Sequence, residues 1–392
     1  MKINKNLLIF AICYISYTAI YIARLNLSMA TPGMIEIGIA DAAGIGFLGS
    51  CFSVIYSFGR LINGVMSDRT PPWIMLCSGL LLAGLSNICI GFFPPFAGII
   101  VLWGANAFAQ SMLWSSVLCV ISEIYGEKAK KASSYIVTSV AVGNLLGIVI
   151  NTVLITKLGL GFAFIVPGGL TLVCGALVFL SVRKIRPAEE KDKKHFSMLK
   201  LLKMKEMKLS LLPAMFHGMM KDNISLWMTV YFVDRFNVNL SESAYFILLI
   251  PVMGFIGRIL YPFCYKLCGE DEHKVSVVGF VSCAILAMPL CFDTSSPILA
   301  AVALSLIYTA VSLINTSMLS IYPIRLANSG NVASVSGIMD FATYLGAGIG
   351  SFVYGIMIKN MGSYVPMYIT WAIVSLASLP VLIMMRKASK KI

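Results

Sequence analysis

The sequence predicts an all-α membrane protein with about twelve transmembrane helices, arranged as two related halves of six helices each. Hydrophobic residues make up 58% of the chain and charged residues 12%, and the mean hydropathy is +0.87, which excludes a water-soluble globule with an ordinary polar surface. Four basic residues lie inside apolar, membrane-length runs. They form two pairs, Arg24 with Lys221 and Arg60 with Arg258, because 221 − 24 gives 197 and 258 − 60 gives 198. The spacing indicates a repeated half.

The first half contains six predicted spans. Its basic start, Met1–Lys5, runs into an apolar stretch without a small-residue cleavage site, so we expect a retained first helix instead of a signal peptide. A window of about 20 residues places the spans in order. Their predicted bounds are Leu7–Ala30, Ala43–Met66, Trp73–Phe93, Phe96–Ile121, Ser134–Ile155 and Gly161–Val182.

The second half repeats this number of spans after a polar segment, Arg183–Lys208. We interpret the segment as a solvated connector, with binding of anionic headgroups as the alternative. We therefore expect an N-terminal half at 1–182, a linker at 183–208 and a C-terminal half at 209–392. The spans that follow the linker are predicted at Leu209–Val233, Ala244–Leu267, Val275–Cys291, Pro297–Ile321, Ser334–Ile358 and Val365–Met385.

The distribution of lysine and arginine predicts the orientation. Outside the spans these residues alternate onto one face, and the opposite face carries only Lys157, Arg235 and Lys359. By the positive-inside rule, both termini and the linker are predicted to be cytoplasmic, in a multi-pass protein of the plasma (inner) membrane. The formal net charge of +13 does not indicate nucleic-acid binding, because the basic residues are not gathered on one soluble domain.

Short motifs recur in the two halves. Ser57–Leu61 in the second span reads Ser-Phe-Gly-Arg-Leu, and Phe255–Ile259 in the eighth span reads Phe-Ile-Gly-Arg-Ile. The same direction and the even number of spans imply a parallel repeat about an axis along the membrane normal. Glycine-rich runs at 143–147 and 346–350 are predicted to let helices pack closely. Two six-helix halves around a central cavity resemble the arrangement of the major facilitator superfamily.

Several segments make this resemblance more specific. Gly64–Arg69 resembles the loop signature of the superfamily, a glycine followed by aspartate-arginine. Tyr17–Ala30 and Ile55–Gly64 are similar to the first two helices of the organophosphate:phosphate antiporters, which include the glycerol-3-phosphate and hexose-6-phosphate transporters. Gln110–Trp114 and Ala342–Gly346 also resemble that family. The resemblance implies exchange of an organophosphate for inorganic phosphate by alternating access, without a cofactor.

The residues of the first helix suit an anionic substrate. Tyr17, Tyr21 and Arg24 occur at i, i+4 and i+7, so one helix face presents two phenols and a guanidinium. A guanidinium fits a pair of phosphate oxygens bidentately. Lys221, on the repeat-related seventh span, is predicted to supply the facing cation. Arg24 and Lys221 are thus the main predicted substrate ligands.

Five further residues are predicted to contact the substrate. Tyr56 and Arg60 lie one turn apart on the second span, Gln110 and Trp114 one turn apart on the fourth, and His217 one turn before the lysine of the seventh. The alternatives are a charge network between helices for Arg60, ordinary packing for Gln110 and Trp114, and a satisfied interior histidine for His217.

Other residues are predicted to act in gating and coupling. Asp68 and Arg69 are expected to hold a cytoplasmic gate closed, and Arg258 is expected to serve a gate or helix packing. Asp222 and Asp340 lie inside spans and are candidates for coupling to protons, with neutralisation of one of the cations as the alternative for Asp340. Asp222 follows the lysine of the seventh span, about 100° away around the helix, so we expect poor direct pairing and a partner from another helix.

Three classes of function remain open: an organophosphate exchanger, a proton-coupled exporter of organic anions or drugs, and a membrane sensor that binds phosphate esters without moving them. The excess of intramembrane cations favours exchange, because an empty cationic cavity resists reorientation.

An enzyme is not predicted, since three histidines are too few for a metal cluster and no phosphate-binding GxxxxGK[ST] motif occurs. The expected partners are a small anion, its counter-anion and the lipid bilayer. The protein is expected to function as a monomer.

Overall fold

The computed structural model describes residues 5–67, 70–183, 198–292, 296–326 and 332–389. These residues form helices and no strands, so the predicted all-α membrane fold is confirmed. Eleven helical stretches among them are long and apolar enough to cross a membrane. A further helix, α10 (Lys205–Phe236, 32 residues), covers the predicted seventh span and carries several charged side chains.

The first six predicted spans lie on helices with closely similar bounds. The fourth span is interrupted at Met112, between α4 and α5, and the fifth at Val137, between α6 and α7. The helices are α1 (Lys5–Glu36), α2 (Ala42–Ser67), α3 (Pro72–Ile90), α4 (Phe96–Ser111), α5 (Leu113–Tyr125), the 3-10 turn η1 (Gly126–Lys128), α6 (Ala129–Ile136), α7 (Thr138–Leu158) and α8 (Phe162–Val182).

The second six spans also lie on helices. The tenth span passes from α13 through a π-helical turn, η2, into the short α14. The remaining helices are α9 (Met198–Lys203), α11 (Leu240–Leu267), α12 (Glu272–Cys291), α13 (Pro297–Thr316), η2 (Ser317–Ile321), α14 (Tyr322–Leu326), α15 (Val332–Met361) and α16 (Val365–Ser389).

The chain divides into two compact units, one formed by residues 1–40 and 54–192 and the other by residues 41–53 and 193–392. The opening turns of α2 thus pack within the second unit. There, a Cβ atom added to Gly46 would lie 2.8 Å from the Cα atom of Gly355 on α15. The Asp41 carboxylate also pairs with the Lys359 amine at 2.8 Å. The boundary expected at 183–208 stays a prediction.

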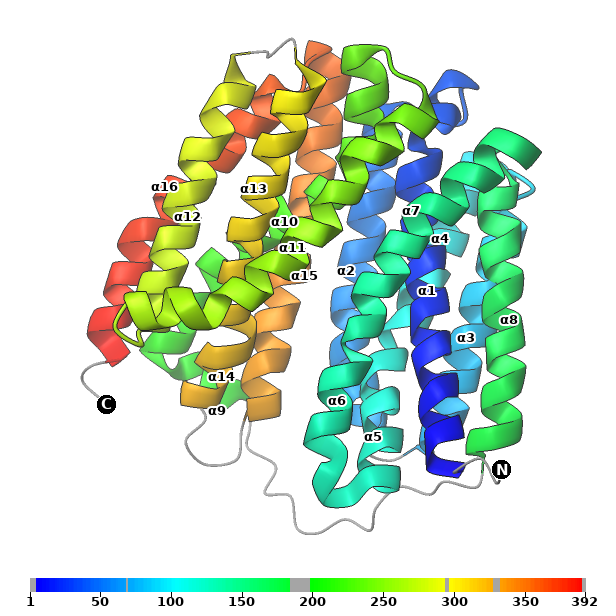
Figure 1. Cartoon of the computed structure of the whole chain (residues 1–392), viewed down its shortest axis with the longest axis horizontal. Coiled ribbons are helices and arrows are strands. Elements are labelled where there is room, and N and C mark those ends of the chain that lie inside the picture. The colour runs from blue at the N-terminus through cyan, green and yellow to red at the C-terminus, as the bar shows by residue number, and fades with distance from the viewer. Residues whose placement is uncertain (1–4, 68–69, 184–197, 293–295, 327–331, 390–392) are drawn as a thin grey trace. The chain divides into compact units, whose positions relative to one another are not determined.

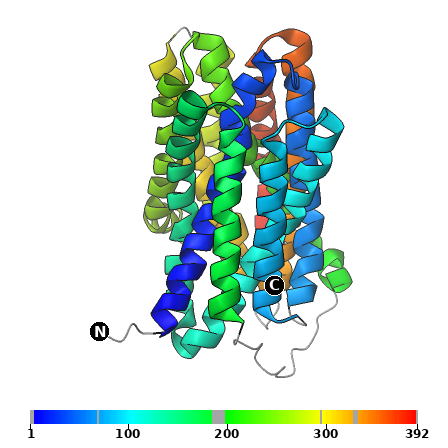
Figure 2. The same cartoon turned by 90° about the vertical axis from the view of Figure 1, so that its right-hand side faces the viewer.

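In the first unit, α1 packs against α7 and α8 (Figure 1), and α1 and α8 also lie side by side in the rotated view (Figure 2). The predicted close approach at 143–147 is confirmed, because a Cβ added to Gly143 would lie 2.6 Å from the Tyr21 Cβ and 2.8 Å from the Thr18 carbonyl oxygen. The glycine therefore allows α7 to support the face of α1 that carries the tyrosines.

In the second unit, α10 packs against α15 and α16, and α12 packs against α16 and α13 (Figure 1). The predicted close approach at 346–350 is also confirmed. A Cβ added to Gly346 would lie 2.0 Å from the Met215 carbonyl oxygen, and one added to Gly218 would lie 1.8 Å from the Thr343 carbonyl oxygen. The two backbones touch, which fixes the register between α10 and α15.

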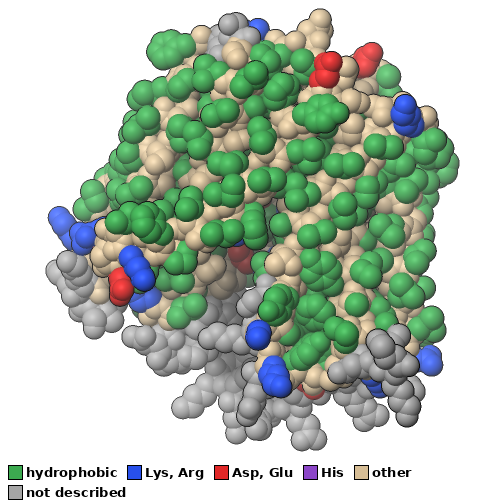
Figure 3. Space-filling view, in the orientation of Figure 1, with side chains coloured by type: hydrophobic (Ala, Val, Ile, Leu, Met, Phe, Trp, Pro, Cys, Tyr) green, Lys and Arg blue, Asp and Glu red, His purple; other side chains and the backbone are tan. Residues whose placement is uncertain are grey.

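Large apolar side chains are exposed along the spanning helices, for example Val101, Leu180 and Phe263. Figure 3 shows hydrophobic side chains over the middle of the helices, with lysine, arginine and acidic side chains near helix ends. An apolar exterior of this kind suits a lipid environment, because large exposed apolar surfaces are rare on soluble monomers.

Candidate functional site

The predicted ligands on α1 lie together on one face. Tyr17 is buried, and its ring centroid lies 5.4 Å from that of Tyr21. The Arg24 guanidinium carbon lies 5.8 Å from the Tyr21 ring centroid. The helical spacing that predicted this face therefore brings the three side chains into one continuous stack.

Tyr56 of α2 connects this stack to a second arginine. Its ring centroid lies 4.9 Å from the Arg24 guanidinium carbon and 5.9 Å from that of Arg60, so both guanidiniums share one aromatic ring. The Tyr56 side chain is buried, which fixes the ring between them. A ring face attracts cations through its quadrupole, and this attraction holds both arginines near each other despite their like charge.

The two predicted residues of the fourth span have different surroundings. The Trp114 ring of α5 lies 5.2 Å from the Tyr17 ring, centroid to centroid, and so extends the aromatic stack. Gln110, near the end of α4, is buried, and its Nε2 donates to the Asn106 Oδ1 at 3.1 Å. The structure therefore brings Trp114 to the stack, whereas the Gln110 amide is engaged within its own helix.

These contacts define a cationic aromatic site in the first unit, consisting of Tyr17, Tyr21, Arg24, Tyr56, Arg60 and Trp114. Arginine stays protonated at any physiological pH, so the site carries two fixed positive charges. Its donors are the N–H groups of two guanidiniums and the hydroxyls of three tyrosines, which suit an oxyanion. Among the described residues no group of three or more histidine, cysteine or acidic side chains is placed to hold a metal ion.

Lys221 lies on α10 in the second unit and is half-buried. Its amine lies 3.8 Å from the Asp222 carboxylate, which is longer than a hydrogen bond. The two neighbours therefore form only a long ion pair, in line with the expected poor direct pairing. Sequence reasoning missed Tyr344 of α15, whose ring centroid lies 5.7 Å from the amine. Tyr344 belongs to the segment 342–346, which resembles the organophosphate:phosphate antiporters. That resemblance was the signal that could have predicted Tyr344 as a site residue.

The other predicted residues are more scattered. His217 is fully buried, and neither ring nitrogen has a hydrogen-bond partner among the described residues. Asp340 is half-buried on α15, one turn before Tyr344, and Arg258 is exposed on α11. Asp68 and Arg69 lie outside the described residues, so their predicted gating role stays a prediction.

The profile described as the Major Facilitator Superfamily matches residues 13–351. The protein belongs to the major facilitator superfamily, as the resemblance of its two halves predicted. It is thus a multi-pass membrane transporter and not an enzyme.

Relatives support the narrower resemblance. The chain is 28% identical over 197 residues to a probable hexose phosphate transport protein of Chlamydia muridarum, a match that covers 47% of this chain and 42% of that protein. It is 36% identical over 110 residues to the glycerol-3-phosphate transporter of Haemophilus influenzae, covering 27% and 23%. A phosphoglycerate transporter protein of Salmonella typhimurium is 21% identical over 402 residues, covering 91% and 84%. The first two matches span less than half the length of those relatives. The resemblance to the organophosphate:phosphate antiporters is thereby confirmed.

Solved structures share the fold. The nucleoside transporter NupG superimposes with a TM-score of 0.77 at 13% identity, covering 98% of this chain and 99% of that one. A bacterial homologue of the human lysosomal transporter Spinster has a TM-score of 0.76 at 13% identity, covering 100% and 96%. At this identity the likeness describes the fold alone.

Proposed function

We propose that this transporter exchanges an organophosphate for inorganic phosphate by alternating access. The observation that carries the proposal is the pair of guanidiniums, Arg24 and Arg60, around the buried Tyr56 ring. Two fixed cations with phenolic donors match a phosphate group, whose several oxygens accept charge-assisted hydrogen bonds. The names of the hexose phosphate and glycerol-3-phosphate relatives support the same class of substrate.

Lys221 is the proposed ligand from the second half, on the evidence of the sequence repeat. Its amine already has the Asp222 carboxylate at 3.8 Å and the Tyr344 ring at 5.7 Å. An incoming phosphate would therefore compete with Asp222 for Lys221. This competition lets the amine remain partly neutralised when no anion is bound, which lowers the cost of a charge inside the membrane.

The excess of cations over carboxylates inside the predicted spans supports exchange. A cavity with net positive charge opposes reorientation of an empty transporter, because moving net charge through a low-dielectric interior is costly. A bound anion offsets this charge, so loaded forms cross more readily. We place the protein in the plasma membrane as a monomer with both termini and the 183–208 linker cytoplasmic, as the lysine and arginine distribution predicts.

Equilibrium binding of inorganic phosphate to the purified protein tests the proposed site. Arg24→Lys keeps the positive charge but loses the planar guanidinium that can bind two phosphate oxygens, so we expect phosphate binding to weaken by about tenfold or more. Arg24→Gln removes the charge as well and should abolish phosphate binding. Lys157→Gln, at an exposed position of α7, is the matched control and should bind phosphate as the wild type does. Unchanged phosphate binding by folded Arg24→Gln protein would contradict the proposal.

Two alternatives have an observation in their favour. The Asp222 Oδ2 is buried and has no hydrogen-bond partner among the described residues, which suits a carboxylate that takes up a proton and favours a proton-coupled exporter. The membrane sensor protein UhpC of Escherichia coli is 30% identical over 106 residues, which favours a sensor. A sensor would bind phosphate through the same site without exchanging it across the membrane.

A further inference from the structure

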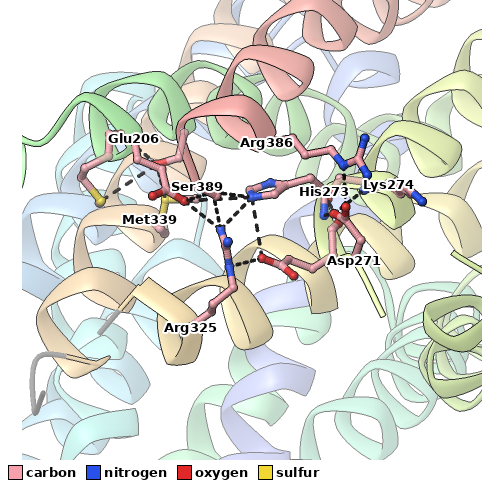
Figure 4. Close-up of polar contacts among 12 residues, drawn as sticks. Glu206, Asp271, His273, Lys274, Arg325, Met339, Arg386 and Ser389 are labelled. Atoms are coloured by element: carbon pink, nitrogen blue, oxygen red, sulfur yellow. Dashed lines mark hydrogen bonds and ion pairs between the residues drawn. The ribbon is translucent and has the colours of Figure 1, made fainter. Parts of the chain in front are cut away.

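A buried cluster of ionisable side chains lies in the second unit, away from the proposed anion ligands. It consists of Glu206 at the start of α10, Glu272 and His273 at the start of α12, Arg325 in α14 and Ser389 at the end of α16 (Figure 4). We refer to it as the Glu206 cluster. Fifteen residues separate Glu206 from the lysine of the proposed site along α10, a rise of about 22 Å.

Arg325 is the centre of this cluster. Its Nη2 lies 2.7 Å from the Glu206 Oε1, 2.7 Å from the Ser389 Oγ and 2.7 Å from the His273 Nε2. Its Nε pairs with the Glu272 Oε1. Through these contacts a single side chain ties α14 to α10, α12 and α16. A guanidinium can only donate hydrogen bonds, so the His273 Nε2 must be the unprotonated, accepting nitrogen in this arrangement.

Among the described residues, the cluster lacks one positive charge. Glu206 and Glu272 contribute −2 and Arg325 contributes +1, which leaves −1 with a neutral histidine. Both glutamates are almost fully buried. An uncompensated charge in such a place is costly, and uptake of one proton removes it.

His273 is the group placed to take that proton. Its Nε2 lies 3.7 Å from the Glu272 Oε1 and 4.0 Å from the Glu206 Oε1, so an imidazolium there would face two carboxylates. The neighbouring Asp271 and Arg386 pair with each other at 2.5 Å and leave no net charge. The phenols that surround the cluster are neutral near pH 7, since tyrosine ionises near pH about 10: they are Tyr261, Tyr265 and Tyr322.

We infer that the Glu206 cluster is a proton-binding site in which a proton on the His273 Nε2 replaces the hydrogen bond from Arg325. Once protonated, Nε2 becomes a donor and can no longer accept from Arg325. The imidazolium then pairs with the carboxylates and makes the cluster neutral, while its like charge pushes the guanidinium away from His273. Arg325 can move because its side chain is 37% exposed, whereas those of Glu206 and Glu272 are 3% and 5% exposed. Acid therefore loosens the contacts of Arg325 that tie α14 to α10, α12 and α16.

The purified full-length protein allows a direct test that does not depend on the proposed function. The chain has three histidines, so imidazole-labelled protein gives a simple NMR spectrum in which His273→Gln identifies the His273 signal. We expect this signal to titrate in the acid range, below the ordinary histidine value of about 6.5, because burial and the Arg325 guanidinium disfavour the imidazolium. Over the same interval, hydrogen exchange at residues 324–326 and 386–389, corrected for the intrinsic effect of pH, should accelerate by about tenfold, as expected for loss of a charge-assisted hydrogen bond.

Variants separate the switch from simple titration. Arg325→Gln should move the His273 titration to higher pH and leave exchange at 386–389 fast and independent of pH. Lys208→Gln removes a positive charge from an exposed position on the same helix as Glu206 and should change neither readout. If a variant does not fold, the His273 titration and the hydrogen exchange of the wild-type protein are sufficient to test the inference. A His273 signal that never titrates, or one that titrates without any change in exchange at 324–326, would overturn the inference.

Discussion

Tyr56 is the residue that joins the two arginines of the cationic aromatic site. Tyr56→Leu removes the ring that both guanidiniums share, at a cost of about 1 kcal/mol per desolvated cation–π contact. We expect phosphate binding to weaken about fivefold or more, because the arginines lose the group that holds them in place. Tyr56→Phe keeps the ring and loses one phenolic donor, so it should weaken binding less than Tyr56→Leu does. Titration calorimetry measures both, and equal affinities for the Leu and Phe variants would argue against a role of the ring.

Asp222 provides a second test at the residue scale. If this carboxylate competes with the substrate for Lys221, Asp222→Asn should bind phosphate a few-fold more tightly, in line with the roughly 0.2–1 kcal/mol of a partly exposed ion pair. The proton-coupled alternative predicts instead that the variant loses the pH dependence of uptake while its phosphate affinity stays the same. Measuring affinity and the pH profile of uptake on the same preparation distinguishes the two roles.

The contact between α10 and α15 governs the position of Lys221 and Tyr344 at the scale of helices. Gly346→Ala places a Cβ 2.0 Å from the Met215 carbonyl oxygen, so the helices must separate. We expect a loss of about 1–3 kcal/mol in the free energy of unfolding, the usual range for overpacking, and weaker phosphate binding. Gly337→Ala on the same helix meets no atom within 4 Å and should be neutral or slightly stabilising. Similar melting temperatures for both variants would show that the close approach is not required.

The opening turn of α2 is held by a pair that titrates in acid. A hydrogen bond from the Lys359 amine, and a second from the Gly44 N–H, hold the pKa of Asp41 below its usual value. A lowered carboxyl pKa contributes stability above the unfolded value of about 3.9, and that contribution is lost as pH falls through the lower folded value. Asp41→Asn should therefore melt below the wild type at pH 7, and the difference should shrink as the pH falls below about 3.9. A difference that persists in acid would mean that the charge of Asp41 contributes nothing.

At the scale of the whole molecule, the spans and the first-helix site were predictable because they depend on local periodicity and length. Tyr17, Tyr21 and Arg24 share a face whatever surrounds the helix. The Glu206 cluster was not predictable, because its members come from four helices that are distant in the sequence. The break at Met112 also carries no strong sequence signal, since no proline or glycine stands at that turn.

Exchange across a membrane is the most direct test of the proposed function. Radiolabelled phosphate should enter proteoliposomes loaded with unlabelled phosphate, without any proton gradient, and should enter empty vesicles far more slowly. Vesicles that contain Arg24→Gln protein should take up no radiolabelled phosphate, whether they are loaded or empty. Uptake into empty vesicles that equals uptake into loaded ones, or uptake that requires a proton gradient, would contradict anion exchange. Phosphate binding without exchange would identify a sensor instead.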